Sequence, residues 1–140
     1  MLIAEKKGGV ISAGDRRTAQ AGVDILRSGG NAFDAAIGAT IMSFVSESTL
    51  TSSGGGGFLL AHTQDGDNLL YDFFTQTPRE RNISEDLDFY PGFLNFKDSQ
   101  QEFKLGLASA AVPGNIAGLF HTHKRLGRMP IKEIVEPAIE

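Results

Sequence analysis

The chain contains no cysteine and no tryptophan among its 140 residues. Without cysteine, disulfide bonds and thiolate metal ligands are excluded. Its 13 lysines and arginines are scattered through a sequence of net charge −4, whereas nucleic-acid binding needs a clustered basic face. No stretch approaches the ~18 apolar residues of a membrane-spanning helix, and the opening MLIAEKKGGV lacks the hydrophobic region of a signal peptide. These absences predict a cytoplasmic protein that binds neither nucleic acid nor membrane.

Imidazoles are also scarce, since His62, His121 and His123 are the three histidines. Two of them, His121 and His123, lie two positions apart on an expected helix and therefore point to different faces. No metal site is expected from this set. The hydrophobic fraction of 41% and the ten phenylalanines are enough to build one core in a chain of single-domain length.

Four consecutive glycines, Gly54, Gly55, Gly56 and Gly57, stand before the short apolar run Phe58 to Leu60. The run lacks the spacing of a phosphate-binding loop or of a dinucleotide-binding turn, and it precedes a strand where those motifs precede a helix. Two interpretations remain open. The glycines form a tight turn or bulge against a neighbouring helix, or they form a backbone wall beside a small-molecule pocket, where a missing Cβ permits close approach.

Two helices are predicted before the glycine run. A brief strand over Val10 to Ala13 comes first, and Asp15 or Thr18 can cap the helix that ends near Arg27. The second helix starts at Asn31, and its many small residues among bulky ones predict burial nearly all round. A polar loop, Ser46 to Ser53, then leads to the glycines.

Beyond the glycines, strands near Gly57 to His62 and Leu69 to Phe74 are predicted to pair through the turn Asp65-Gly66-Asp67. The segment Thr75 to Phe103 is irregular, and its aromatic residues predict that it packs down as a long loop. The remaining elements are expected in chain order: a strand over Leu105 to Val112, a helix capped by Asn115 that runs to Leu126, and a helix opening at Met129-Pro130.

Local chemistry is sparse. Asp72, at the end of the return strand, is either a catalytic acid or a residue that caps a turn or pairs with Arg79. Ser12, Ser52 and Ser53 have no evident base beside them in the sequence, so no nucleophile is assigned to this chain.

Four segments in a fixed order resemble the γ-glutamyltransferases, also called glutathione hydrolases. AGVDILRSGGNAFDAAI, Ala21 to Ile37, is similar to the helix-GGNA-helix segment of that family, and Glu47 follows at the family's spacing. GGGGFLL, Gly54 to Leu60, and DFFTQTP, Asp72 to Pro78, resemble its glycine strand and the strand end after it. Ala111 to Glu140 resembles its VPG segment and the helices that follow.

The resemblance implies an α+β fold, part of an αββα sandwich of N-terminal-nucleophile hydrolases in which helices pack on an antiparallel sheet. Such a protein is made as one precursor that cuts itself, and the new N-terminal threonine of the small subunit becomes the nucleophile. A γ-glutamyl group passes to that threonine and then to water or an amine, with no cofactor. Residues 1–140 then form an incomplete domain, the opening part of the large subunit, whose partners are the small subunit and a small γ-glutamyl or acyl-amide substrate.

Two departures from the family pattern stand out. Phe74 occupies the position of the arginine that binds the substrate's α-carboxylate, and a phenyl ring cannot replace a bidentate guanidinium. Arg79 or Arg81 is a possible substitute. We therefore expect a subgroup with an altered acyl preference. In the second departure, STLTSS, Ser48 to Ser53, replaces the family's Pro-x-Ser-Gly-Ile pattern.

Two other functions are compatible with the residues alone. The chain ends at Glu140 on a rising amphipathic helix, which also fits a truncated, catalytically inert fragment. A small α/β binding module built on the glycine run, with a nucleotide as ligand, is the third hypothesis. If the chain is part of a sandwich, one face of its sheet is expected to be exposed and apolar.

Overall fold

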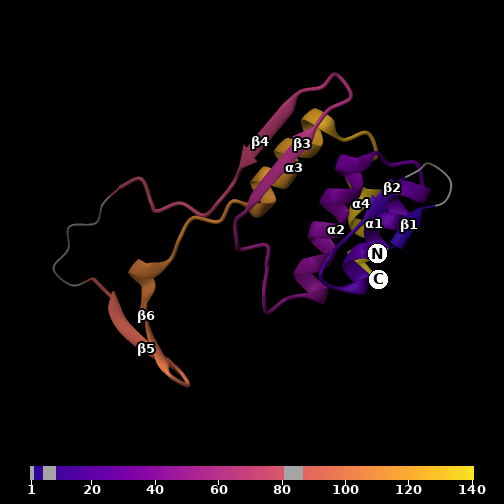
Figure 1. Ribbon diagram of the computed structural model, residues 1–140. Helices are drawn as coiled ribbons and strands as arrows, with labels where there is room; N and C mark the ends of the chain where they lie inside the picture. The colour runs from indigo at the N-terminus through magenta and orange to yellow at the C-terminus, as the bar shows by residue number, and fades with distance from the viewer. Residues whose placement is uncertain (1, 5–8, 81–86) are drawn as a thin grey trace. The chain divides into compact units, whose positions relative to one another are not determined.

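The computed structural model describes residues 2–4, 9–80 and 87–140. They divide into two compact units, the first made of Met1–Phe74 with Pro113–Glu140 and the second of Thr75–Val112. Among the described residues the strands form three separate antiparallel pairs. The expected α+β class is thus confirmed, with helices and antiparallel strands in one chain (Figure 1).

The first unit begins with the strand pair β1, Leu2–Ala4, and β2, Gly9–Ile11. Helix α1, Arg16–Arg27, follows, and the Asp15 carboxylate caps it by accepting a hydrogen bond from the Arg17 amide. The Arg17 side chain also donates to this carboxylate, which lowers the pKa of Asp15. The predicted brief strand and first helix are therefore present, and the cap is Asp15 rather than Thr18.

Helix α2, Ala32–Ser46, begins with a capping box between Asn31 and Asp34. The prediction that this helix is buried nearly all round is wrong for this chain. Ala32 and Ala36 on one side and Val45 on the opposite side are exposed, because no described segment covers them.

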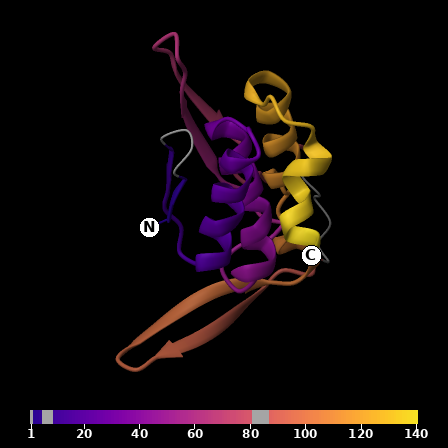
Figure 2. The same cartoon turned by 90° about the vertical axis from the view of Figure 1, so that its right-hand side faces the viewer.

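Helices α3, Asn115–Leu126, and α4, Ile131–Ile139, complete the helical part of the first unit. α4 lies beside α2, and α2 lies beside α1, in both views (Figures 1 and 2). The apolar faces of the four helices meet in one core of buried side chains. Burial of each larger apolar side chain contributes about 1.5–3 kcal/mol to the free energy of unfolding, because its surface is removed from water. The buried members of this core are Ile25, Ala35, Ile37, Leu119, Met129 and Ile134.

Asp34 connects three of these helices. Its carboxylate has no exposed surface and accepts hydrogen bonds from the amides of Asn31 at 2.8 Å, Arg128 at 3.0 Å and Met129 at 3.2 Å. The last two residues form the connection between α3 and α4. Because a buried carboxylate must be satisfied by donors, this one side chain fixes the α3–α4 connection to the start of α2.

The hairpin of β3, Phe58–His62, and β4, Asn68–Asp72, packs on α3 (Figure 1). The predicted Asp-Gly turn joins the two strands, with Gly66 at a φ of +91° that favours glycine. Ala61 and Tyr71 form the buried face, and the Tyr71 ring lies 5.9 Å from the ring of His121 on α3. β4 ends at Asp72, two residues earlier than predicted.

The second unit contains a hairpin that the sequence analysis missed. β5, Tyr90–Phe96, pairs with β6, Ser99–Leu105, inside the segment predicted to be an irregular loop. The prediction that its aromatic side chains pack against the rest of the domain is wrong, since these side chains are exposed. These are Phe89, Tyr90, Phe93, Phe96 and Phe103.

Two further predictions are wrong in detail. Leu105 to Val112 is not one strand, because Gly106 at a φ of +100° breaks it into the end of β6, a 3₁₀ turn at Leu107–Ser109 and a single bridge from Val112 to Gln76. Asn115 does not cap α3. Gly114 occupies the cap position, and the Asn115 side chain instead donates to the Ser52 carbonyl.

Candidate functional site

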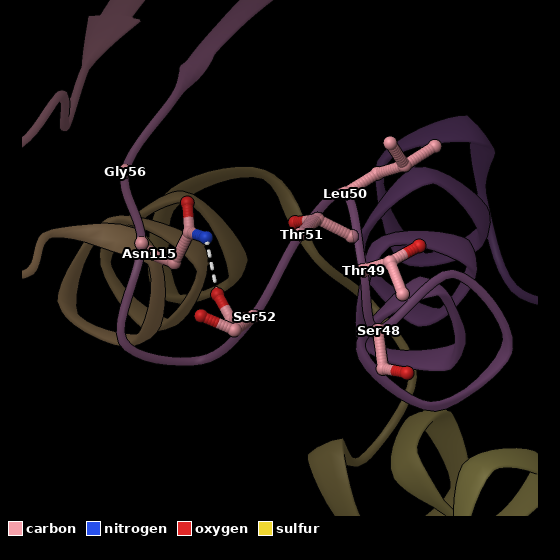
Figure 3. Close-up of a pocket in the computed structure, with 8 residues that line it drawn as sticks. Ser48, Thr49, Leu50, Thr51, Ser52, Gly56 and Asn115 are labelled. Atoms are coloured by element: carbon pink, nitrogen blue, oxygen red, sulfur yellow. Dashed lines mark hydrogen bonds between the residues drawn. The ribbon is translucent and has the colours of Figure 1, made fainter. Parts of the chain in front are cut away.

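The loop between α2 and β3 is held against the beginning of α3. The Gly55 carbonyl accepts hydrogen bonds from the amides of Gly114 and Asn115, both at 3.0 Å. The Asn115 amide side chain, which is buried, donates to the Ser52 carbonyl at 2.7 Å (Figure 3). Segments about sixty residues apart in the sequence are thus joined by three hydrogen bonds, so the path of the glycine run is fixed by α3.

Neither backbone conformation nor crowding explains the whole glycine run. None of Gly54 to Gly57 is in the left-handed region, where glycine is favoured. A Cβ on Gly55 would lie 3.2 Å from the Asn115 side chain, which supports the interpretation of a turn against a helix at this position. On Gly54 or Gly57 the nearest described atom that a Cβ would meet lies 3.7 or 3.5 Å away. The interpretation as a wall open to an outside group thus remains compatible with the geometry.

A cavity of about 250 Å³ lies beside this loop. Figure 3 shows Ser48, Thr49 and Leu50 on one side of it and the Asn115 side chain on the other. Four hydroxyl-bearing residues from the STLTSS segment line the cavity, together with the backbone of two glycines: Ser48, Thr49, Thr51, Ser52, Gly55 and Gly56. The STLTSS segment therefore gives the cavity a largely hydroxyl-bearing lining.

The β3–β4 ladder continues one residue pair beyond the strands and carries the chain into the candidate site. The Gly57 amide donates to the Phe73 carbonyl at 3.3 Å, and the Phe73 amide donates to the Gly57 carbonyl at 3.1 Å. The Phe73 ring lies on α3 at Gly118, and its carbonyl lies at Gly114, so closely that a Cβ on either glycine would collide with it. These contacts fix Phe73 on the helix side of the hairpin.

Phe74 is placed on the opposite side. Its amide donates to the Asp72 carboxylate at 3.0 Å, as in an Asx turn, which supports the turn-capping interpretation of Asp72. The Phe74 ring stacks on the Phe58 ring with centroids 5.4 Å apart and 12° between the planes. Both side chains are still about half exposed, at 51% and 60%. Gly57 pairs with Phe73, so the structure brings the glycine run next to Phe74.

One face of the β3–β4 hairpin is uncovered by the described residues, and its middle and its end near the glycine run are largely apolar, whereas Asp72, His62 and Asn68 on the same face are polar. The register pairs Leu60 with Leu70, and Phe58 and Phe74 lie on the same face nearer the glycine run. Leu60 and Leu70 are 72% and 65% exposed. The expected exposed apolar sheet face is therefore present, and such a face marks a surface that another element or a ligand covers.

The structure does not test the two arginines named as possible substitutes for a guanidinium at Phe74. Arg79 belongs to the second unit, where its side chain is exposed, and Arg81 falls outside the described residues. Phe58, by contrast, is a residue of the site that the sequence analysis missed. The signal for it was the alternation of β3, which places Phe58, Leu60 and His62 on one face once the Asp-Gly turn sets the register.

The three histidines are engaged separately. The His62 ring bonds the Asn68 side chain, the His123 ring bonds the Met129 carbonyl at 2.8 Å, and the His121 ring contacts Tyr71. Within residues 2–4, 9–80 and 87–140, no group of three or more acidic, histidine or cysteine side chains is arranged to hold a metal ion. Over the same part of the chain, none of the helices has the length and apolarity needed to cross a bilayer.

Residues 18–140 match the family model described as gamma-glutamyltranspeptidase. The chain belongs to this family, and its fold is part of the N-terminal-nucleophile hydrolase sandwich. This confirms the resemblance found in the sequence.

Individual relatives agree with this assignment. The chain is 36% identical over 139 residues to Glutathione hydrolase 3 of Arabidopsis thaliana, covering 99% of this chain and 20% of that protein. It is 29% identical over 124 residues to the Acylase ACY 1 proenzyme of Pseudomonas sp. (strain V22), covering 85% of this chain and 22% of the relative. It superimposes on the crystal structure of Helicobacter pylori gamma-glutamyltranspeptidase with a TM-score of 0.77 at 27% identity, covering 99% of this chain and 38% of that one. The chain thus spans about a fifth of the length of these two curated relatives.

Proposed function

We propose that residues 1–140 are the N-terminal segment of the large subunit of an acyl-amide hydrolase or transferase of the γ-glutamyltransferase type. The observation that carries the proposal is the family match over residues 18–140. The exposed Leu60 and Leu70 of the β3–β4 hairpin support it, because an incomplete sandwich leaves such side chains uncovered. The names of the relatives, a glutathione hydrolase and an acylase proenzyme, indicate amide substrates and a precursor.

The chemistry assigned to the complete protein is acyl transfer through an N-terminal threonine of the small subunit. The threonine α-amine takes the hydroxyl proton while the hydroxyl oxygen attacks the amide carbonyl of glutathione or a related acyl amide. The carbon–nitrogen bond breaks, the amine leaves with a proton, and an acyl ester remains on the threonine. Water or an acceptor amine then cleaves that ester. No residue of the present chain takes part in bond making, and no cofactor is required.

The role assigned to this chain is to form one wall of the acyl pocket, with Phe74 and Gly54 to Gly57 beside it. Phe74 stands where the family resemblance places a carboxylate-binding arginine. A phenyl ring has neither charge nor donors, so the affinity for the α-carboxylate of a γ-glutamyl group is reduced. We therefore propose a preference for acyl groups less polar than γ-glutamyl, unless Arg79 or Arg81 supplies the charge in the complete protein.

The proposal of a processed enzyme is tested by expressing the complete coding sequence and measuring the masses of its products. Two fragments, the smaller one starting with threonine, together with hydrolysis of an acyl anilide are expected. A single uncut chain without hydrolase activity would contradict the proposal and favour the inert fragment or the small binding module. A thermal shift with nucleotides would support the binding module alone.

The role of Phe74 is tested by Phe74→Arg in the same protein. Restoring a guanidinium should raise kcat/KM for a γ-glutamyl anilide about 10- to 100-fold, the effect of regaining one or two charge-assisted hydrogen bonds. Phe74→Leu is the control, because it removes the ring without adding charge and should give no such gain. Wild-type kinetics equal to those of a relative that carries the arginine would defeat this assignment.

A further inference from the structure

We infer that Phe58 is a specificity-determining residue that forms, together with Phe74, an aromatic wall selecting acyl groups with a flat, uncharged side chain. The inference rests on the proposed function, which places Phe74 at the acyl pocket. It names a second residue of that pocket and a substrate class, neither of which follows from Phe74 alone.

The two rings form one surface. They come from different strands, with Phe58 at the start of β3 and Phe74 two residues beyond β4, and they are diagonal neighbours across the extended ladder. Their planes differ by 12° and their centroids lie 5.4 Å apart. A group that lies along the exposed edges of the two stacked rings therefore contacts Phe58 as well as Phe74.

The position of the wall is fixed by backbone contacts rather than by the rings themselves. Phe73 is wedged on α3 at Gly114 and Gly118, and its amide and carbonyl bond Gly57. The Asp72 carboxylate accepts the Phe74 amide. Because Phe73 is held on the helix side, the next side chain must point to the other side, where Phe58 stands.

The chemistry of the wall determines its ligand. Neither ring can donate to a carboxylate or neutralise it, and the Asp72 carboxylate, which is paired with Phe58 across the ladder, carries the same charge as a substrate α-carboxylate. A flat apolar group stacks favourably on such rings. The neighbouring glycines carry no side chain that would block approach from the β3 end of the hairpin. The favoured substrates are hence amides of arylalkyl carboxylic acids, for which phenylacetyl anilide is a simple probe.

The experiment uses the complete, processed protein and two substrates with the same leaving group, phenylacetyl and butyryl p-nitroanilide. Phe58→Leu keeps an apolar side chain but removes the flat ring. We expect kcat/KM for the phenylacetyl substrate to fall about two- to tenfold, the range of an aromatic pair, while the butyryl substrate changes much less. Phe93→Leu, the same change at a similarly exposed phenylalanine of β5, is the matched control and should leave both substrates unchanged.

A second measurement needs no variant. Phenylacetate should inhibit the wild-type enzyme more strongly than L-glutamate does. Equal loss on both anilides in Phe58→Leu, or stronger inhibition by glutamate, would overturn the inference and leave the proposed hydrolase intact. A processed protein that hydrolyses neither anilide nor a γ-glutamyl anilide would overturn the proposed function and this inference with it.

Discussion

The two long hairpins of the chain have the same pairing but differ in what covers them. In β3–β4 one face lies on α3, where Ala61 and Tyr71 are buried, and the opposite face is exposed. In β5–β6 every residue except the partly buried Gly92 is exposed. An isolated two-stranded hairpin is marginally stable in water, so β3–β4 gains stability from the helix, whereas the described residues of its own unit give β5–β6 no such support.

The comparison indicates that contacts with α3, more than the residues of the strands, hold the candidate site in place. We call α3 and its connection to α2 the helical platform. Gly114 and Gly118, at and after the start of α3, leave room for Phe73, and the Asn115 side chain holds the loop before β3 through Ser52. The connection after α3 is in turn fixed to α2 by the buried Asp34 carboxylate. A perturbation of this platform should therefore affect β3–β4 and leave β5–β6 largely unchanged.

The largest effect is expected from Asp34→Ala. The change leaves the amides of Asn31, Arg128 and Met129 without their acceptor, and buried unsatisfied donors cost about 1–3 kcal/mol each. We expect the free energy of unfolding to fall by roughly 3 kcal/mol or more, measured by denaturant unfolding of the complete protein. Amide exchange should rise in β3–β4 more than in β5–β6.

Asp24→Ala serves as the control for that change. Asp24 is half exposed and pairs with Arg27 at 3.6 Å on the surface of α1, an arrangement worth about 0–1 kcal/mol. If Asp34→Ala were no more destabilising than Asp24→Ala, the carboxylate would not be what holds α3 to α2.

A smaller effect is expected from Gly118→Ala. The new methyl group would collide with the Phe73 ring, and overpacking of this kind costs about 1–3 kcal/mol, against up to ~1 kcal/mol gained from better helix propensity. The matched change in the other hairpin is Gly92→Ala, where the methyl group would meet the flexible end of the Leu105 side chain. Gly118→Ala should lower the melting temperature and anilide hydrolysis, and Gly92→Ala should lower them less. The reverse order would show that Phe73 is not anchored as described.

The sequence predicts one hairpin and not the other for a physical reason. Asp65-Gly66 supplies the glycine that a positive φ requires, so the turn of β3–β4 is visible in the sequence. In β5–β6 the turn is made by Lys97 and Asp98, with Lys97 at a φ of +41°, and Pro91 and Gly92 lie within the first strand. Both features argue against a strand in the sequence, and the pairing that overrides them is visible only in the structure.

The candidate site is predictable to a similar, partial extent. The glycine run was found from the residues themselves and Phe74 from the resemblance, and helical periodicity with its stop signals gave the four α-helices of the described residues. The stack of Phe58 on Phe74 depends on the strand register, and the role of Asn115 depends on contact with Ser52, 63 positions away in the sequence. Such long-range contacts arise from tertiary packing, and no local pattern encodes them.

The smallest expected effect tests the turns themselves. Lys97→Gly should relieve a left-handed conformation that costs a non-glycine residue about 1–2 kcal/mol, offset by about 0.5–1 kcal/mol of glycine entropy. Amide exchange in β5–β6 should slow by a factor of up to about five, which corresponds to a gain of up to ~1 kcal/mol.

Gly66→Ala makes the opposite change at a φ of +91°, so exchange at the turn of β3–β4 should accelerate. Because α3 supports β3–β4 and the turn of β5–β6 has only its own strands, the effect of Lys97→Gly should spread along its whole hairpin and that of Gly66→Ala should stay near the turn. Faster exchange in Lys97→Gly would mean that the lysine side chain stabilises β5–β6 by more than the backbone strain that it imposes.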